Sequence, residues 1–434
     1  MKKIVKRLYL LEEKRQQETL QMIPSENHAS KAVRECCASF FMNKYSEGYP
    51  FKRYYQGNKY VDELESLVIE KIKKIFKVEH ANVQPYSGSP ANSAVLFGLL
   101  NYGDKIMGLK LSAGGHLTHG HSNITFSGRF FKSVQFDVNE RGFIDYDEVE
   151  RLALKEKPKL LIIGTTSYPM KLDWERFGKI ADKIKAYFVA DIAHVAGLVT
   201  GGAYPSPVPF CHIVTTTTHK TLRGPRGAII MITKKGLEKD KELKEKIDRA
   251  VFPGLQGGPH NNTTLAILQC LCEAETKEFK KYAKQVVKNS KVLAQEFKKA
   301  GLKLVCNGTE SHLIVIDLRP LNVLGNVAAI ALERAGIIVN SNSVPHDPMP
   351  PFYPSGIRLG TPALTTRGMK EKEMKIIAGY IVEVLEAIKH MQTPSKKEEI
   401  KNYLSKYKKE IEKNKKLLEI AKKVKKLALK FPIK

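Results

Sequence analysis

Residues 215–227 read TTTTHKTLRGPRG, and the rest of the chain is organised around this stretch. Short apolar runs, 211–214 and 228–232, flank it, and each is typical of a buried strand. The glycines and the proline between them predict a turn, which places Lys220 between two core strands. Such a lysine is either solvated or made nucleophilic by nearby arginines and partial burial, so that it can form an imine. This window alone leaves both interpretations open.

The residues before and after this stretch alternate between strand and helix patterns. Strand-like apolar runs occur at 81–84, 105–111, 160–164 and 186–190, and helical patterns at 60–76 and 89–100. Continuous apolar runs separated by helices indicate a mainly parallel sheet covered on both faces. A helical tract at 262–299, followed by strands at 312–318 and 336–340 around a helix at 326–335, predicts a smaller second α/β domain.

Four segments follow from these patterns. We predict an N-terminal helical arm (1–26), a large domain (27–280), a small C-terminal domain (281–394) and a basic helical extension (395–434). The extension holds 15 Lys against 5 Glu, with leucine and isoleucine at helical spacing. A solvated helical surface is the favoured interpretation of this charge.

Composition bounds the class of protein. The 434 residues include no signal peptide pattern, no membrane-length apolar run and no paired cysteine spacing among six cysteines, so we expect a cytoplasmic protein. A net charge of +27 raises the alternative of a nucleic-acid-binding protein that uses its basic tail. Arginine supplies only 15 of the 72 basic residues and no nucleic-acid-binding signature is present, which weighs against this alternative.

Polar residues follow several predicted strands, where ligands bind in open parallel sheets. Ser87, Gly88 and Ser89 open a predicted helix, and backbone N–H groups there can cradle a phosphate, although the same residues serve as an ordinary cap. Asp191 ends a buried run, where a carboxylate needs a cationic partner unless it caps a helix.

The sequence HLTHGH at 116–121 contains three histidines. No carboxylate or cysteine completes a recognised metal spacing, so we predict no metal, and one imidazole could instead lie flat against a planar cofactor. Phosphate cradle, imidazole, strand-end aspartate and lysine together meet the needs of pyridoxal 5′-phosphate. Their occurrence in one α/β domain is more specific than any one of them.

With these residues, the chain resembles the serine hydroxymethyltransferase (glycine hydroxymethyltransferase) family, and its archaeal members in particular. The resemblance covers nearly the whole length. Its blocks are MIPSEN at 22–27, NKYSEGYP at 43–50, GHLTHG at 115–120, ADIAHVAGL at 190–198, residues 215–227, FPGLQGGP at 252–259 and GIRLGTP at 356–362. It implies a fold-type I (aspartate-aminotransferase-like) enzyme, with a seven-stranded, mainly parallel sheet in the large cofactor-binding domain.

The resemblance also implies a role for each matching residue. Lys220 would form the imine with the cofactor, Asp191 would bind the pyridine nitrogen, His116 would stack on the ring, and Thr217 and His219 would position them. The phosphate would be held by Ser87, Gly88, Ser89 and, across a homodimer interface, by Tyr45 and Gly258. The substrate would contact Ser25, Tyr55, His194, which also borders the cofactor, and Arg358, whose guanidinium grips the carboxylate.

The implied reaction interconverts serine and glycine and transfers the one-carbon unit to a reduced pterin. Glu47 is the best acid–base candidate, and the implied pterin contacts are Glu47, Tyr54, Leu111, Gly115, Leu117 and Asn342. Ala113 and Thr166 depart from the family pattern beside these contacts, which leaves tetrahydrofolate and tetrahydromethanopterin both open. A threonine or allo-threonine aldolase, or another fold-type I enzyme, remains an alternative that needs Lys220 and Asp191 but not Glu47.

Overall fold

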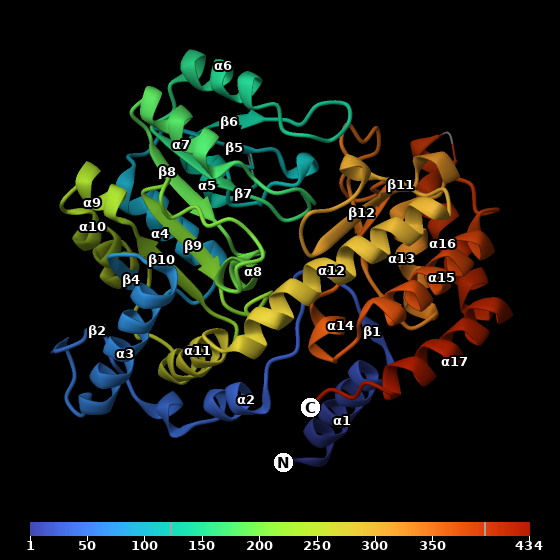
Figure 1. Ribbon diagram of the computed structural model, residues 1–434, viewed down its shortest axis with the longest axis horizontal. Coiled ribbons are helices and arrows are strands. Elements are labelled where there is room, and N and C mark those ends of the chain that lie inside the picture. Colours follow the sequence, from blue (N-terminus) through green and yellow to red (C-terminus); the bar gives the residue numbers. More distant parts are fainter. Residues whose placement is uncertain (122–123, 395) are drawn as a thin grey trace. The chain divides into compact units, whose positions relative to one another are not determined.

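The predicted strands on either side of Lys220 lie in one seven-stranded sheet of the computed structural model, which describes residues 1–121, 124–394 and 396–434 (Figure 1). The strands, in spatial order, are β4 (His80–Asn82), β10 (Ala228–Ile232), β9 (Ile213–Thr217), β8 (Tyr187–Asp191), β7 (Leu160–Gly164), β5 (Lys105–Leu109) and β6 (Lys132–Phe136). All neighbours pair in parallel except β10, which runs antiparallel to β4 and β9. The prediction of a mainly parallel α/β sheet is therefore confirmed.

One strand of this sheet escaped the sequence analysis. Strand β6 has the sequence KSVQF, in which polar and apolar residues are mixed, and most of its side chains are only partly buried. It pairs with one neighbour, β5, at the edge of the sheet. Since an edge strand buries less apolar surface, it lacks the continuous apolar run that marks the central strands.

Helices cover both faces of the sheet. On one face, α4 (Gly88–Leu99) and α10 (Leu243–Arg249) contribute Val95 and Ile247 to a buried cluster with alternate strand residues such as Ile162 and Ile230. On the other, Phe177 of α7 (Trp174–Lys183) lies 6.3 Å from the ring of Phe188. The other helices here are α2 (Lys31–Cys37), α3 (Lys59–Phe76), α5 (Phe126–Phe130), α6 (Tyr146–Glu156), α8 (Ala196–Thr200), α9 (Lys234–Lys239) and α11 (Asn261–Ala274).

The chain divides into two compact units. Unit 2 comprises residues 29–139 and 143–284 and holds the seven-stranded sheet and the hairpin of β2 (Gly48–Tyr49) and β3 (Lys52–Arg53). Unit 1 comprises residues 1–28, 140–142 and 285–434. Helix α12 (Lys277–Lys299) carries the chain from one to the other, and the predicted helical tract 262–299 is interrupted between α11 and α12.

Unit 1 is built on a four-stranded antiparallel sheet in the order β11 (Lys303–Leu304), β12 (Leu313–Asp317), β15 (Gly356–Gly360) and β14 (Asn340–Asn342). Strand β1 (Leu20–Gln21) pairs in parallel with β13 (Ile337–Ile338). The helices are α1 (Lys3–Glu18), α13 (Gly325–Arg334), α14 (Pro362–Thr366), α15 (Glu371–Ile388), α16 (Ile400–Lys413) and α17 (Lys415–Leu429). Among the described residues, no helix is long and apolar enough to cross a bilayer.

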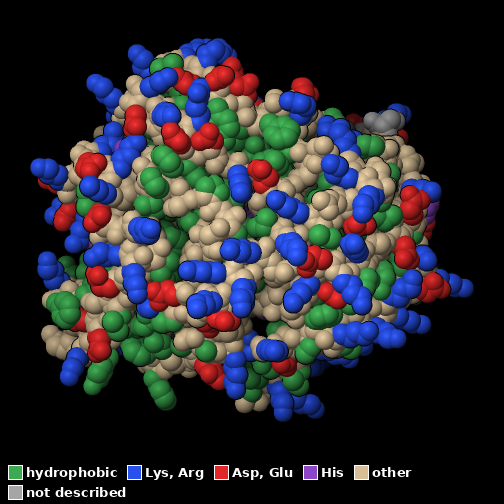
Figure 2. All heavy atoms as spheres, viewed as in Figure 1, with side chains coloured by type: hydrophobic (Ala, Val, Ile, Leu, Met, Phe, Trp, Pro, Cys, Tyr) green, Lys and Arg blue, Asp and Glu red, His purple; other side chains and the backbone are tan. Residues whose placement is uncertain are grey.

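The basic C-terminal segment is part of this unit's core. Ile411 of α16 and Ile420 and Val424 of α17 are fully or almost fully buried in the same cluster as Ile314 and Ile381. Most lysines of both helices point outward, and Figure 2 shows Lys and Arg spread among acidic side chains over the visible face. Ser395, with which the predicted extension begins, lies outside the described residues.

Candidate active site

A small cavity in unit 2 is lined by residues at or after the ends of β4, β5, β7, β8 and β9. Six residues predicted from the sequence line it: Gly88, His116, Asp191, His194, Thr217 and Lys220. His119, Thr165, Thr166 and Ala193 complete the lining. The carboxyl ends of neighbouring parallel strands meet at one edge of the sheet, which explains why residues more than 100 positions apart converge here.

A second, larger cavity of about 900 Å³ lies elsewhere in unit 2. It is lined by the β2–β3 hairpin, α3 and α10, with Asp248 and His80 among its polar side chains. None of the cavity residues named above is among its lining residues. Lys220 and Asp191 therefore line the smaller cavity, whereas Tyr54, a predicted pterin contact, lines the larger one.

The Asp191 carboxylate is held by three donors. His119 Nε2 lies 3.0 Å and Asn92 Nδ2 lies 2.9 Å from Oδ2, while the backbone N–H of Ala193 donates to Oδ1 at 3.0 Å. Asn92 is itself oriented by Thr215, whose hydroxyl donates to Asn92 Oδ1 at 2.7 Å. Burial alone would raise the pKa of Asp191, but the hydrogen bond and charge of His119 outweigh it and hold that pKa well below its usual range.

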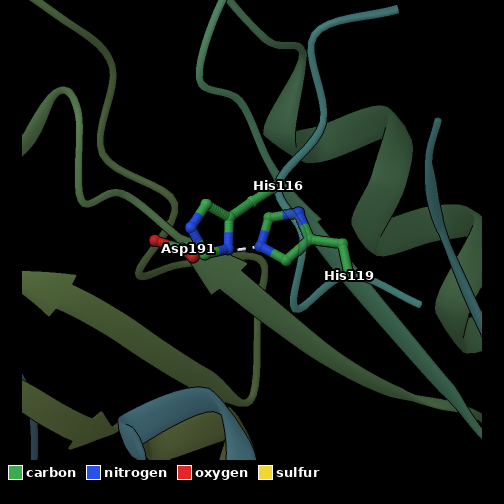
Figure 3. Close-up of side chains that lie close together, drawn as sticks. All are labelled: His116, His119 and Asp191. Carbon is green, nitrogen blue, oxygen red and sulfur yellow. Dashed lines mark hydrogen bonds and ion pairs between the residues drawn. The ribbon is translucent and has the colours of Figure 1, made fainter. Parts of the chain in front are cut away.

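Two histidines reach toward this carboxylate, as Figure 3 shows. His116 is partly buried, and its Nδ1 lies 2.8 Å from the hydroxyl of Thr118. Burial and the neighbouring His119 lower the pKa of His116 to about 4, so its imidazole is neutral at neutral pH. A neutral, flat ring is suited to stacking on an aromatic cofactor.

Metal-ligating atoms of His116, His119 and Asp191 all lie within 4.8 Å of one another. The fold thus brings the Asp191 carboxylate to the two histidines, although Asp191 is too far away in the sequence to form a recognised metal-binding spacing with them. His119 already donates to Asp191, and His116 already pairs with Thr118, so both histidines have hydrogen-bonding roles in the described structure. These same groups offer an anionic acceptor and a flat ring to a protonated pyridine.

The predicted phosphate cradle lies at the start of α4. Ser87 is the N-cap residue, and Gly88 and Ser89 occupy the first helical positions, where backbone N–H groups lack helical acceptors. A Cβ on Gly88 would lie 2.7 Å from Thr217 Cγ2. The missing side chain therefore allows the helix terminus to approach β9 and the cavity closely.

Lys220 follows β9 in a tight turn, as predicted. Its carbonyl accepts from Arg223 N at 3.1 Å, and Thr217, the last residue of β9, directs its hydroxyl toward the carbonyl of Ala193 at 3.4 Å. Burial and the charge of Lys220 lower the pKa of His219 to about 3, which keeps its ring neutral. Within the described chain, His219 Nδ1 is buried without a hydrogen-bond partner.

Tyr45, Glu47 and Gly258 form a separate group in unit 2. The ring of Tyr45 packs over Gly258, where an added Cβ would lie 3.2 Å from the tyrosine ring, and Glu47 Oε1 lies beside Gly257. Tyr55 meets Tyr45 edge to face at 5.2 Å between centroids. These residues are absent from the lining of the cavity that contains Lys220.

The residues assigned to the pterin are distributed over both units. Leu117 and Tyr54 are exposed in unit 2, and Leu111 opens a 3-10 turn before Gly115. Thr166 donates to the carbonyl of Gly115 at 2.8 Å, so this departure from the family pattern orders the same loop.

Three predicted residues belong to unit 1. Arg358 lies in β15 and its Nε donates to Asn340 Oδ1 at 3.1 Å. Asn342 ends β14 and donates to the carbonyl of Ser343. Ser25 is partly buried in the segment that follows β1.

The sequence analysis missed the residues that hold Asp191. His119 lies in the histidine-rich run that was noticed, but nothing in the run shows which ring meets the carboxylate. Asn92 lies in the middle of the apolar helix α4, and Thr215 lies in the middle of strand β9. Both side chains are almost fully buried, and a polar residue in a segment expected to be buried needs a hydrogen-bond partner, which was the available signal.

Comparison with known proteins agrees with this geometry. The family model described as serine hydroxymethyltransferase matches residues 2–381. Serine hydroxymethyltransferases of Acidothermus cellulolyticus and Wolbachia pipientis wMel are 52% and 53% identical over 378 and 375 residues, covering 87% and 86% of this chain and 87% of each relative. That of Desulfotalea psychrophila is 51% identical over 374 residues, 86% of each chain. The chain therefore belongs to the serine hydroxymethyltransferase family and is a pyridoxal-phosphate-dependent transferase that interconverts serine and glycine with transfer of a one-carbon unit.

Proposed function

We propose that Lys220 is the residue that binds pyridoxal phosphate covalently, in the cavity of unit 2. The observation that carries this proposal is the ionised Asp191 in the lining of the same cavity. Three donors hold this carboxylate, two of them on Oδ2, so Oδ1 can also accept from a protonated pyridine nitrogen. The bound cofactor supplies an electron sink for the pair left on the substrate Cα when the one-carbon unit departs.

The remaining lining residues orient the cofactor. His116, neutral at neutral pH, stacks on the ring without adding a positive charge beside it. Ser87, Gly88 and Ser89 donate to the phosphate from the start of α4, where the helix dipole favours an anion. Thr217 and His219 fix the strand end and turn on either side of Lys220, and His194 closes the cavity next to Asp191.

We assign the amino acid carboxylate to Arg358, with help from Ser25, Tyr55 and His194. A guanidinium forms two parallel hydrogen bonds to a carboxylate, and the contact of Arg358 Nε with Asn340 limits the rotation of its plane. Glu47 is the proposed acid–base group that moves a proton at the hydroxymethyl oxygen. Substitution of Glu47 by glutamine removes this function without changing the side-chain size.

We propose a homodimer in which Tyr45, Glu47 and Gly258 complete the site of the other subunit. Eight large apolar side chains between residues 40 and 67 are exposed, with Phe40 90%, Phe51 80% and Tyr54 71% accessible. Figure 2 shows hydrophobic side chains gathered at the lower left, where Figure 1 draws β2, α2 and α3. An exposed apolar surface of this extent favours association, and the group that includes Tyr45 lies within it.

The one-carbon acceptor is proposed to be a reduced pterin bound by Glu47, Tyr54, Leu111, Gly115, Leu117 and Asn342. Both tetrahydrofolate and tetrahydromethanopterin present the pterin ring that the exposed Tyr54 and Leu117 can contact. We also place the enzyme in the cytoplasm, because all six cysteines are free thiols, as a reducing compartment would keep them.

Borohydride reduction tests the central assignment. After reduction with pyridoxal phosphate, peptide mass analysis should find the cofactor on Lys220 of the wild type and nowhere in Lys220→Ala. Lys234→Ala, an exposed lysine of α9, is the matched control and should label like the wild type. Stoichiometric labelling of another lysine in the wild type would refute the proposal.

A further inference from the structure

Arg223 adopts a backbone conformation that arginine disfavours. Its φ is +64°, in the left-handed region, although glycine or asparagine is the usual choice there. It closes the turn that begins at Lys220, because its N–H donates to the Lys220 carbonyl at 3.1 Å. The next residue, Gly224, donates to the carbonyl of Thr218 at 2.7 Å.

The side chain of Arg223 lies against two aromatic rings of α12. Its guanidinium carbon is 4.3 Å from the ring centroid of Tyr282 and 5.2 Å from that of Phe279. Tyr282 contacts the same turn a second time, since its hydroxyl donates to the Thr221 carbonyl at 3.2 Å. Cation–π contacts at these distances are stabilising, most of all when partly shielded from water.

We propose that Arg223 is a positioning residue for Lys220. Its stack on Tyr282 and Phe279 holds the left-handed residue in place, and thereby holds the turn that presents the lysine to the cavity. This inference rests on the proposed role of Lys220 for its consequence in catalysis. Its structural part, the ordering of residues 219–223 by α12, is independent of that role.

Four variants separate stacking from backbone strain. Arg223→Gly removes the guanidinium and relieves the strain of the left-handed backbone. Arg223→Ala also removes the guanidinium but keeps the backbone strain. Tyr282→Leu removes the ring, and Tyr282→Phe keeps the ring but deletes the hydroxyl. Arg226→Ala, an exposed arginine in the same loop, is the matched control.

Amide hydrogen exchange of 219–223 in the cofactor-free protein is the first measurement. We expect about tenfold faster exchange in Arg223→Gly, Arg223→Ala and Tyr282→Leu, and little change in Arg226→Ala. In the double variant Arg223→Gly, Tyr282→Leu the exchange rate should rise by less than the product of the two single effects, because both substitutions remove the shared stack of Arg223 on Tyr282. Tyr282→Phe should stay closer to the wild type than Tyr282→Leu does.

The second measurement is cofactor retention, with the dissociation constant of pyridoxal phosphate rising about tenfold in Arg223→Gly. If Arg223→Gly exchanges its amides and retains pyridoxal phosphate as the wild type does, the proposal is overturned. Arg223 would then have no part in positioning Lys220. If wild-type protein fails to label at Lys220, the proposed function fails, while the exchange result still decides the role of Arg223.

Discussion

Replacing His119 by phenylalanine tests what keeps Asp191 ionised. His119 is 1% exposed, so a ring of similar size can occupy its place. The substitution deletes the Nε2 contact to Asp191 Oδ2 at 3.0 Å, while Asn92 and the Ala193 N–H continue to donate. The change therefore removes one of the three donors to a buried carboxylate.

The expected cost follows from this single contact. A hydrogen bond to a charged group contributes about 1.5–3 kcal/mol, which corresponds to a rise of roughly one to two in the pKa of Asp191. Because that pKa is depressed in the folded protein, its stabilisation is present above the unfolded pKa and is lost as pH falls through the folded value. His119→Phe should therefore be less stable at pH 7 by about 1.5–3 kcal/mol and should unfold in acid at a higher pH.

A double-mutant cycle isolates the contact. Denaturant unfolding of cofactor-free wild type, His119→Phe, Asp191→Asn and the double variant can be followed by Trp174, the single tryptophan, which packs in unit 2 near Phe188. A coupling energy of about 1.5–3 kcal/mol is expected. A coupling below about 0.5 kcal/mol would show that His119 acts only through packing, and would refute this account of the Asp191 pKa.

Three further predictions concern other parts of the chain. Gly115→Ala should destabilise the protein by about 1–3 kcal/mol, because its Cβ would lie 2.0 Å from the Leu109 carbonyl oxygen; thermal unfolding measures this. Phe51→Lys should weaken dimerisation at least tenfold in sedimentation, since it places a charge on the exposed apolar surface. Ile420→Ala should cost about 2–5 kcal/mol in unfolding experiments, because this side chain of α17 is fully buried.

Each of these predictions has its own control and contradicting result. Gly379→Ala, with no atom within 4 Å of the added Cβ and, like Gly115, no positive φ, is the control for collision. Equal losses of stability in the two variants would argue against collision. An unchanged sedimentation profile of Phe51→Lys would show that Phe51 does not lie in the dimer interface. Wild-type stability of Ile420→Ala would mean that α17 adds little to the unit 1 core.

The burial of α16 and α17 also changes how nucleic-acid binding should be tested. Deleting residues 395–434 would expose the core around Ile420, so loss of binding would report unfolding. Replacing the exposed Lys408, Lys415 and Lys422 by glutamine keeps the fold and lowers the charge. If the basic tail binds nucleic acid, affinity and its salt dependence should both fall in a filter-binding assay; no change in either would exclude these lysines.

The local pattern of residues 215–227 was sufficient to place Lys220 in a turn between two core strands, and the apolar runs predicted a mainly parallel sheet. Hydrophobic periodicity reports how a segment buries its side chains, and it succeeds where an apolar run is buried continuously, as in β7 and β10. It failed at β6, where an edge strand mixes polar and apolar residues. It also could not show that the lysine-rich C-terminal helices belong to the unit 1 core, because their charge dominates their composition.

The sequence by itself predicted, from positions at strand and helix ends, a group of site residues of which Lys220, Asp191, His116 and Gly88 line one cavity. Only the tertiary structure decided how Asp191 remains charged and how the turn at Lys220 is held. His119, Asn92 and Arg223 make contacts with partners 56 to 99 residues away in the chain. Such contacts depend on how strands and helices pack. The local sequence does not show which side chains this packing brings together.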